Sequence, residues 1–409
     1  MKTVIMAGGR GTRIAELNPN VPKPMIEICN RPVLEWQIDC LKKQNYTDIV
    51  IIIGYLGYFI KNFFEDGHHM GVSISYIEEQ VPLGTAGSLY YLKQEIQNNF
   101  LLLNGDVFFN IDLMRFFNHH HKYGGLATIF THPNDHPSDS SIVVSDSNCC
   151  VTKWLHKDDQ RGWFKNQSNA GLHFLSPKAL QTLTSATKLD LDQDVLKPMI
   201  LKKQLFAYSS PEYVKDMGTP HRHKSIEIDL ISGKVQKKNL QNKQKAIFLD
   251  RDGTINKYVG FLTKIDDFEL IEGVAEMIRE MNQSGYLVIV VTNQPVIARG
   301  EVSWAELGEI HNKMETLLGY HGAYVDDIFI CPHHPHKGYP GENVIYKNDC
   351  DCRKPKPGLL LNAARKYNID LRISFMVGDR NSDIDAGKKA GCLTYKVYTN
   401  QLPKRKFWD

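Results

Sequence analysis

Short runs of apolar residues alternate along the chain with segments whose apolar residues recur every three or four positions. The runs predict buried strands, and the recurring pattern predicts amphipathic helices. The predicted strands are Val4–Ala7, Ile49–Ile53, Phe100–Leu103, Leu126–Thr131, Ala246–Leu249, Leu287–Thr292 and Phe375–Val377. The predicted helices are Leu34–Gln44, Ser88–Gln97, Val274–Ser284, Trp304–Leu318 and Gly358–Tyr367. This alternation indicates an α/β fold.

The pattern breaks once, in a polar stretch that begins near residue 222. Lys, Gln and Asn replace large apolar residues there, before a new strand starts at Ala246. A chain of 409 residues also exceeds what one hydrophobic core usually fills. We therefore predict two doubly wound domains, 1–222 and 246–400, joined by a linker at 223–245 and followed by a tail at 401–409.

Composition narrows the class of protein. Charged residues make up 23% and hydrophobic residues 42% of the chain, and the formal net charge is +3, which gives no reason to expect a nucleic acid or a membrane surface as partner. No apolar run reaches the roughly 18 residues of a membrane-spanning helix. The first apolar run is too short for a secretory signal. We expect a cytoplasmic protein whose eight cysteines form no disulfide framework, and a homo-oligomer is left open.

A glycine-rich turn, MAGGRGTR at 6–13, follows the first predicted strand. Glycines directly after a strand let the backbone approach a phosphate, and consecutive N–H groups form an anion-binding nest. Such turns are common, so three later features matter: Lys23 between two prolines, Asp106 at a strand end, and Asp216 opening DMGTP. Singly, these would read as a surface lysine, a strand-end cap and a turn residue. Their joint occurrence in this order favours a phosphate-handling site.

In this order, the four motifs resemble those of the sugar-1-phosphate nucleotidylyltransferases, over about residues 1–222. The resemblance implies a Rossmann-like fold that binds a nucleoside triphosphate and a sugar 1-phosphate, with catalysis by positioning and charge neutralisation. It assigns the triphosphate to Gly8, Gly9, Gly11 and Arg13, catalytic charge neutralisation to Arg13 and Lys23, and Mg²⁺ to Asp106 and Asp216.

Further stretches match the family's base and sugar segments. The resemblance places Gly84, Thr85 and Gly87, after the stretch EEQ at 78–80, near the base, and Asn169 and Gly171 at the sugar. One departure matters, because many members carry Glu-Lys where this chain has His156-Lys157. Lys157 keeps a phosphate-binding role on this reading, while recognition of sugar hydroxyls by His156 is open.

Two carboxylates, Asp250 and Asp252, follow the strand that opens the second half, in the stretch LDRDGT. Carboxylates at i and i+2 can share a loop that faces a ligand, where one attacks phosphorus and the other protonates the departing oxygen. Both would be costly to bury unpaired. Thr292-Asn293, Lys354 and Gly378-Asp379 supply the other parts of such a site. We expect all four stretches at the carboxyl ends of parallel strands, where doubly wound sheets bind ligands.

These stretches resemble the four motifs of the haloacid dehalogenase superfamily of phosphatases. The resemblance makes Asp250 the nucleophile that becomes an aspartyl phosphate, and Asp252 the acid and then the base. It assigns the transferring phosphoryl group to Thr292 and Lys354, substrate binding also to Asn293, and Mg²⁺ to Asp250, the backbone carbonyl of Asp252, and Asp379, with Asp383 in support.

Three cysteines lie among histidines, in Cys331-Pro332-His333 and Cys350-Asp351-Cys352. These four ligands can close a tetrahedral Zn²⁺ site, which would be structural and would fix the loop that leads to Arg353 and Lys354. The spacing is tighter than in zinc fingers. His334 and His336 are rival ligands, and buried free cysteines beside solvent-exposed histidines are the alternative.

The cysteine loop, with DRDGT and TNQ, resembles the D-glycero-D-manno-heptose 1,7-bisphosphate phosphatases. Histidinol-phosphate phosphatases share the loop pattern. On this resemblance Arg353 contacts substrate and Arg299 is available to it. The chain reads TNQPVIARG at 292–300 where relatives often read TNQSGIARG, and Pro295 should stiffen that loop.

The two resemblances describe consecutive reactions. The hypothesis is a bifunctional enzyme that removes the 7-phosphate of D-glycero-α-D-manno-heptose 1,7-bisphosphate and transfers a nucleotidyl group, GMP from GTP, to the heptose 1-phosphate. Its cofactors would be Mg²⁺ and Zn²⁺. One alternative is a hexose-1-phosphate nucleotidylyltransferase fused to a phosphatase of other specificity. Another is a non-catalytic nucleotide-sugar sensor, which would not need five aspartates at these motif positions.

Overall fold

The computed structural model describes residues 1–9, 20–338, 340–403 and 406–408. Gly11 and Arg13 therefore lie outside the described residues. The chain divides into two compact units. Unit 1 comprises Met1–His132, Val143–Trp154 and Asn169–Asn239, and unit 2 comprises Pro133–Ile142, Leu155–Ser168 and Leu240–Asp409. Within the described residues, no helix combines the length and apolar character needed to cross a membrane.

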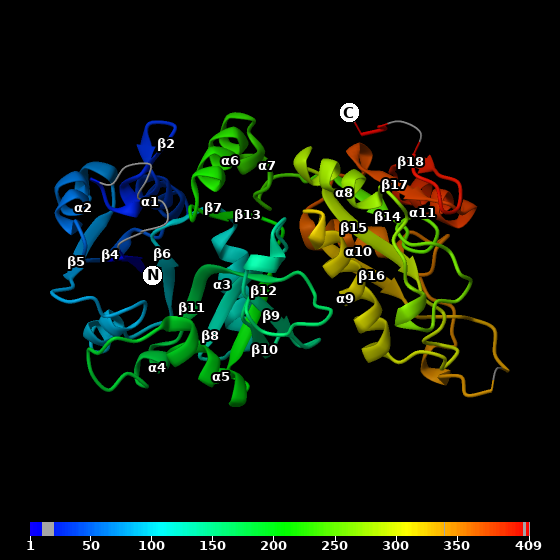
Figure 1. The fold of residues 1–409 in the computed structure, drawn as a ribbon, viewed down its shortest axis with the longest axis horizontal. Coiled ribbons are helices and arrows are strands. Elements are labelled where there is room, and N and C mark those ends of the chain that lie inside the picture. The colour runs from blue at the N-terminus through cyan, green and yellow to red at the C-terminus, as the bar shows by residue number, and fades with distance from the viewer. Residues whose placement is uncertain (10–19, 339, 404–405, 409) are drawn as a thin grey trace. The chain divides into compact units, whose positions relative to one another are not determined.

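Unit 1 is built on a mixed sheet whose central strands are parallel (Figure 1). The parallel neighbours are, in spatial order, β5 (Ser73–Glu78), β4 (Asp48–Ile53), β1 (Lys2–Ala7) and β6 (Phe100–Asn104). On the far side of β6 the sheet continues through β11 (Ser168–Leu175), β9 (Ile142–Ser145) and β10 (Val151–Leu155), and β8 (Ala127–His132) joins β11 to β12 (Leu205–Ser209). Smaller antiparallel pairs are β7 (Val107–Asn110) with β13 (Tyr213–Asp216), and β2 (Glu27–Ile28) with β3 (Arg31–Pro32).

Helical segments cover both faces of this sheet. One face packs against α1 (Val33–Lys43), α2 (Gly57–Phe64) and α3 (Leu113–Tyr123), and the other against the 3₁₀ segment Gly87–Leu92, α4 (Pro177–Leu180) and α5 (Lys197–Leu201). Adjacent residues of one strand, such as Val4 and Ile5, belong to opposite cores. This burial on both faces explains why the strands read as unbroken apolar runs.

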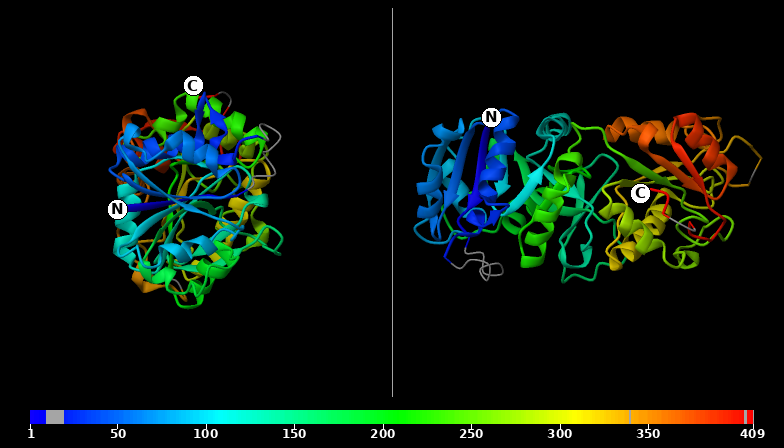
Figure 2. Two further views of the ribbon diagram at one scale, coloured as in Figure 1. Left: turned by 90° about the vertical axis from the view of Figure 1, so that its left-hand side faces the viewer. Right: turned by 90° about the horizontal axis from the view of Figure 1, so that it is seen from above.

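Unit 2 is built on a parallel sheet with two helices on each face (Figure 2). The strand order is β16 (Asp327–Cys331), β15 (Leu287–Asn293), β14 (Ala246–Leu249), β17 (Phe375–Gly378) and β18 (Leu393–Lys396). One face carries α8 (Val274–Gln283) and α9 (Trp304–Tyr320), and the other carries α10 (Gly358–Tyr367) and α11 (Asn381–Ala390). The predicted α/β class with doubly wound sheets is confirmed.

One local prediction was wrong, and one segment has more regular structure than its polar sequence suggests. The segment Ser88–Gln97 forms only the 3₁₀ turns of Gly87–Leu92 rather than an α-helix. Most of the stretch 223–245, predicted to be a linker, is helical, in α6 (Pro220–Ile231) and α7 (Lys234–Lys237). These helices have few apolar residues, but Ile226 and Val235 are buried in one core. A narrow apolar contact therefore suffices to order a largely polar sequence.

Candidate active sites

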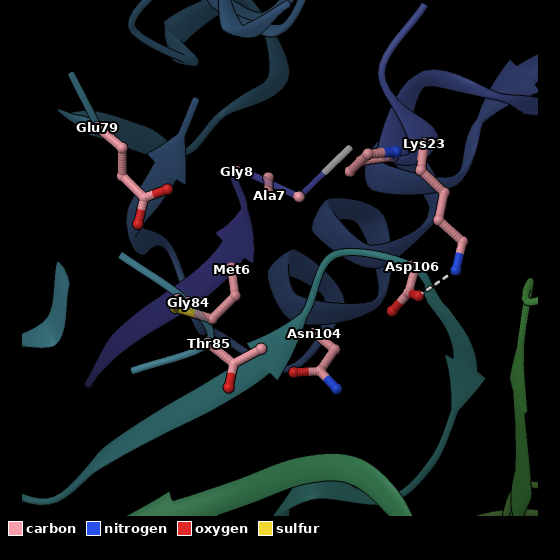
Figure 3. A pocket seen from close by; sticks show the side chains of 11 residues that line it. Met6, Ala7, Gly8, Lys23, Glu79, Gly84, Thr85, Asn104 and Asp106 are labelled. Atoms are coloured by element: carbon pink, nitrogen blue, oxygen red, sulfur yellow. Dashed lines mark hydrogen bonds and ion pairs between the residues drawn. The ribbon is translucent and has the colours of Figure 1, made fainter. Parts of the chain in front are cut away.

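A cavity of about 340 Å³ lies at the carboxyl ends of β1 and β6 in unit 1 (Figure 3). Its lining includes Gly8, Gly9, Lys23, Glu79, Gly84, Thr85, Asn104 and Asp106. This volume is typical of small-molecule sites. Six residues assigned from separate motifs thus meet in one cavity: Gly8, Gly9, Lys23, Gly84, Thr85 and Asp106.

Lys23 and the two predicted metal ligands adjoin one another. The Lys23 Nζ pairs with the Asp106 carboxylate (Figure 3). Asp216 ends β13 opposite Val107, and the Met217 N–H donates to the Asp106 carbonyl at 3.0 Å, which brings the two aspartates to neighbouring strand ends. Burial acts to raise the pKa of Asp216, but Arg222, the Gly218 N–H and Lys23 hold it below its ordinary value. Asp216 is not among the described residues that line the cavity, and the Arg222 Nη1 donates to both of its carboxylate oxygens at 2.9 Å. Carboxylates are nevertheless the ligands that a hard cation such as Mg²⁺ prefers.

Gly84 and Gly87 are required by close backbone packing. A Cβ on Gly84, whose φ is +76°, would lie 2.2 Å from the Leu189 carbonyl oxygen, and one on Gly87 would lie 2.0 Å from that of Thr187. The Thr85 Oγ1 accepts from the Leu191 N–H at 2.7 Å. The loop that contains Gly84, Thr85 and Gly87 is therefore fixed by close contacts with residues 187–191. The sequence motif alone does not show this constraint.

The sugar turn predicted at Asn169 and Gly171 adjoins the same cavity. A Cβ on Gly171 would lie 2.6 Å from the Asn104 Nδ2, and Asn104 lines the cavity. The Asn169 Oδ1 accepts from the Gly171 N–H at 3.1 Å, which fixes the turn. His156 and Lys157 belong to the unit 2 segment Leu155–Ser168, and neither is among the described residues that line the cavity.

Glu79 lines the cavity, but the sequence analysis assigned it no specific role. The Ser88 Oγ donates to its Oε1, while its Oε2 lies next to Gly8, within 2.7 Å of the position a Cβ would take there. Burial raises the pKa of Glu79, and the hydrogen bonds from Ser88 and the Leu83 backbone oppose that rise. One carboxylate oxygen is thus held by the protein, and the other faces the cavity.

A second cavity, of about 420 Å³, lies in unit 2 at the carboxyl ends of β14 and β15. Its lining includes Asp250, Asp252, Tyr258, Phe261, Asn293, Gln294, Pro295, His334, Arg353, Lys354, Arg380 and Asp383. Residues from all four motifs of this half therefore meet. Arg299 lies beside this lining, since its guanidinium sits 4.5 Å from the centre of the Phe261 ring and pairs with Glu301 at 2.7 Å.

Lys354 is buried between two carboxylates. Its Nζ lies 2.7 Å from the Asp250 Oδ1 and 2.7 Å from the Asp383 Oδ1, and it donates to the Val291 carbonyl at 2.8 Å. Burial raises the pKa of Asp250 to about 6 although Lys354 opposes the rise. Asn293 holds the Lys354 backbone through two hydrogen bonds of 3.0 Å.

The expected position of Lys354 at a strand end was wrong. It follows the long loop after β16 and stands just before α10. Loop residues, rather than a strand, therefore bring this ammonium group to the site.

Asp252 is held by side chains that no motif assigned. The Arg251 Nη2 lies 2.9 and 3.0 Å from its two oxygens, the Asn256 Nδ2 donates to Oδ1 at 3.1 Å, and the Gln294 Nε2 donates to Oδ2 at 2.8 Å. Burial acts to raise the pKa of Asp252, but these donors hold it below its ordinary value. Gln294 also donates to the Thr292 Oγ1 at 2.8 Å, which ties two motifs together. The only sequence signal for Arg251, Asn256 and Gln294 was their position within or next to the motif stretches.

Asp250, Asp379 and Asp383 fit a divalent cation. One ligand atom from each lies within 4.8 Å of the others, and all three residues are buried. The Asp379 Oδ1 is buried and has no hydrogen-bond partner among the described residues. Since an orphaned buried carboxylate oxygen is costly, this arrangement suits Mg²⁺.

The cysteine loop gathers four soft ligands. The Cys331, Cys350 and Cys352 Sγ atoms and the His333 Nδ1 lie within 4.8 Å of one another. The Sγ of Cys350 is 3.6 Å from that of Cys331 and 3.3 Å from that of Cys352. A tetrahedral zinc with Zn–S bonds of about 2.3 Å needs sulfur atoms roughly 3.8 Å apart, so the cluster fits. His333 belongs to it, whereas its rival His334 lines the second cavity.

Comparison with known proteins assigns a family to each half of the chain. A family model described as nucleotidyl transferase matches residues 2–228, and one described as HAD-hydrolase-like matches residues 351–405. The D-glycero-β-D-manno-heptose-1,7-bisphosphate 7-phosphatase of Pasteurella multocida is 47% identical over 147 residues, which cover 36% of this chain and 77% of that protein. The protein of the same name from Escherichia coli K12 is 43% identical over 149 residues, covering 36% and 76%.

Two solved structures share the nucleotidyl transferase fold. HddC from Yersinia pseudotuberculosis aligns with a TM-score of 0.50 at 22% identity, covering 56% of this chain and 99% of that one. A putative glucose-1-phosphate thymidylyltransferase from Bacillus anthracis aligns with a TM-score of 0.51 at 18% identity, covering 56% and 96%. At these identities the likeness concerns the fold alone.

Proposed function

Because this chain belongs to the nucleotidyl transferase family, and its HAD-like domain to the D-glycero-β-D-manno-heptose-1,7-bisphosphate 7-phosphatases, we propose that it carries out two consecutive reactions. It removes the 7-phosphate of a heptose 1,7-bisphosphate, and it transfers GMP from GTP to the resulting heptose 1-phosphate. The observation that carries the proposal is chemical continuity: the product of the unit 2 reaction is the acceptor that a unit 1 reaction requires.

The phosphatase reaction uses Asp250 and Asp252. The negative charge of the bound phosphate favours the protonated form of Asp252, against the donors that stabilise its carboxylate. A carboxylate oxygen of Asp250 attacks the phosphorus, and the bond to the sugar oxygen breaks as protonated Asp252 donates its proton to that oxygen. Asp252 then takes a proton from water, whose oxygen attacks the phosphorus as the bond between phosphorus and the Asp250 oxygen breaks, which releases phosphate and restores the Asp250 carboxylate. Lys354, which lies against Asp250, neutralises phosphoryl charge, and Asn293 keeps Lys354 in place.

In the transfer reaction, a phosphate oxygen of the heptose 1-phosphate attacks the α-phosphorus of the nucleotide, and pyrophosphate leaves. Lys23 and the N–H groups near Gly8 and Gly9 face the phosphates in the first cavity. Bound Mg²⁺ would neutralise phosphate charge in both sites, held by Asp106 and Asp216 in one and by Asp250, Asp379 and the Asp252 carbonyl in the other.

Glu79 supports guanine as the base. An ionised carboxylate only accepts hydrogen bonds. Among the common bases, guanine alone presents two adjacent donors, N1–H and the N2 amino group, on its pairing edge. The Oε2 of Glu79 faces the cavity while Ser88 orients the carboxylate, so a guanine could donate to it directly. We propose the α-anomer of the sugar, following the guanylyltransferase resemblance, although the phosphatase relatives are named for the β-anomer.

Zn²⁺ is proposed for the cluster of three cysteines and His333. Its role would be structural, because all four coordination positions are taken by protein. Arg353 donates to the His333 carbonyl at 3.0 Å, so a closed site would also fix the orientation of Arg353 at the second cavity.

The test uses purified protein, Mg²⁺, and synthetic α- and β-heptose 1,7-bisphosphate, each offered with GTP, ATP, CTP, UTP or dTTP. Phosphate and pyrophosphate release are followed, and the nucleotide sugar is identified by mass spectrometry. We expect phosphate from the α-anomer and GDP-heptose only with GTP. The variant Asp250→Asn should lose phosphate release and still use supplied heptose 1-phosphate. Absence of phosphate from both anomers overturns the proposal, and turnover of the β-anomer alone overturns the choice of anomer.

A further inference from the structure

Arg251 contacts both catalytic carboxylates of unit 2. Its backbone N–H donates to the Asp250 Oδ1 at 2.8 Å, and its guanidinium donates hydrogen bonds to both carboxylate oxygens of Asp252. The Arg251 side chain is completely buried, so its position depends on the groups around it rather than on solvent. Arg251 therefore helps to fix the position of the Asp252 carboxylate, together with Asn256 and Gln294.

The other side of the guanidinium contacts His311, which lies 60 positions further along the chain on α9. The Arg251 Nη1 is 3.1 Å from the His311 Nε2. Arginine only donates, so the Nε2 must accept, and the proton of the neutral ring must be on Nδ1. Burial, together with Arg251, lowers the pKa of His311 to about 3, which agrees with a neutral imidazole.

A neutral acceptor has a specific advantage at this position. A carboxylate in place of His311 would compete with Asp252 for the positive charge of Arg251. Neutral imidazole orients the guanidinium and leaves its charge to Asp252. The N-terminus of α9, the helix that carries His311, is stabilised because Ser303 and Glu306 form a capping box at its first turn.

We infer that His311 is a positioning residue for the phosphatase reaction, acting through Arg251 on the acid–base residue Asp252. This inference rests on the proposed function of unit 2. His311 is not among the described residues that line the second cavity. Replacing it should therefore change the rate of the chemical steps and leave substrate binding nearly intact.

The experiment compares two variants of the full chain, His311→Met and His311→Gln. Methionine fills a similar volume without the acceptor, whereas the glutamine Oε1 can take the place of the Nε2. We expect His311→Met to lower kcat for phosphate release from the bisphosphate by about tenfold or more, with KM within about twofold. His311→Gln should recover kcat to within about threefold of the unmodified chain.

Two controls separate positioning from folding. Met314→Leu changes a buried side chain on the same helix and should leave kcat unchanged. Each variant should also keep its full rate of GDP-heptose formation from supplied heptose 1-phosphate, a reaction of the other unit in the same polypeptide.

The outcomes are distinguishable. An unmodified chain that hydrolyses neither bisphosphate overturns the proposed phosphatase, and the positioning role with it. An active unmodified chain whose His311→Met variant keeps kcat within about twofold overturns the positioning role alone. So does a His311→Gln variant as slow as His311→Met, or a His311→Met variant that loses the transfer reaction as well.

Discussion

Under the proposed function, the single carboxylate of Glu79 selects the nucleobase. Glu79→Gln replaces one of its two acceptor oxygens with a donor, which faces the donors of guanine unfavourably. We expect kcat/KM for GTP to fall by about tenfold or more, since a good two-point contact to a base is worth about 1–3 kcal/mol. The preference for GTP over ATP should shrink with it. Steady-state kinetics with all five nucleotides measure both effects.

The neighbouring Glu78 provides a matched control. It is exposed and pairs with Lys61 at 3.8 Å. Glu78→Gln should leave the order of nucleotide preference unchanged. If Glu79→Gln also kept the preference for GTP, the base would be recognised by other groups.

Lys354 is the cation on which two buried carboxylates depend. Lys354→Met leaves Asp250 and Asp383 facing each other without it, and breaking a buried charge pair costs about 3–5 kcal/mol. We expect loss of phosphate release and a lower unfolding temperature, partly restored by Mg²⁺. Calorimetry with and without Mg²⁺ measures this. Lys356→Met removes an exposed lysine two positions away and should change neither quantity. A stable Lys354→Met variant would mean that the carboxylates adjust by taking up a proton.

At the scale of elements, we expect bound zinc to stabilise the cysteine loop. Cys352→Ser removes one soft ligand, so bound zinc should fall from about one per chain to near zero. Phosphate release should fall with it, because Arg353 is oriented by the same loop. Plasma mass spectrometry of the purified variant gives the metal content. Cys392→Ser, which alters a buried cysteine outside the cluster, is the control. Full zinc content in Cys352→Ser would disprove the assignment of this ligand.

Helix α9 also contains a buried carboxylate, Glu315, whose Oε2 accepts from the Asn166 N–H at 2.9 Å within unit 2. Burial raises its pKa from 4.5 to about 7. A carboxyl group whose pKa is raised by folding stabilises the fold fully below about pH 4.5, and this stability is lost as pH rises through about 7. Glu315→Gln should therefore match the unmodified chain near pH 4 and be up to about 3 kcal/mol more stable at pH 8.

Urea unfolding across this pH range tests the expectation. Glu309→Gln, on an exposed position of the same helix, should leave the pH dependence unchanged. An equal stability difference at pH 4 and pH 8 would contradict the role of ionisation.

How well a feature could be predicted from the sequence depends on how far apart in the sequence its interacting residues lie. Strands such as Ala246–Leu249 were predicted well because burial on both faces leaves a continuous apolar run. The motif residues were predicted to converge because they follow strands that lie side by side. Lys354 was misplaced because a long loop, not a strand, delivers it. His311 carried no signal, since its partner Arg251 is distant in sequence and an isolated histidine in a helix most often serves packing.

At the scale of the whole molecule, the two halves are linked by chemistry. Each unit has its own cores and its own cavity, and the described residues that line each cavity all come from that unit. The two departures from family pattern, His156 and Pro295, both lie in unit 2, although His156 was predicted as part of the first domain. No described lining residue of one cavity belongs to the other unit, so we expect a variant that is inactive in one reaction to keep the other.

That independence predicts the behaviour of mixed variants. Asp250→Asn should make no phosphate from the bisphosphate, and Asp106→Asn should make no nucleotide sugar from heptose 1-phosphate. Mixed in equal amounts with the bisphosphate and GTP, the two should form GDP-heptose, because the intermediate diffuses freely between molecules. The expected rate is about half that of the same total amount of unmodified chain, because only half of the molecules carry an intact phosphatase site and the other half carry an intact transferase site. Mass spectrometry of the product over time measures it. A mixture much slower than this, with each single reaction at full rate, would mean that the intermediate passes directly between sites of one chain.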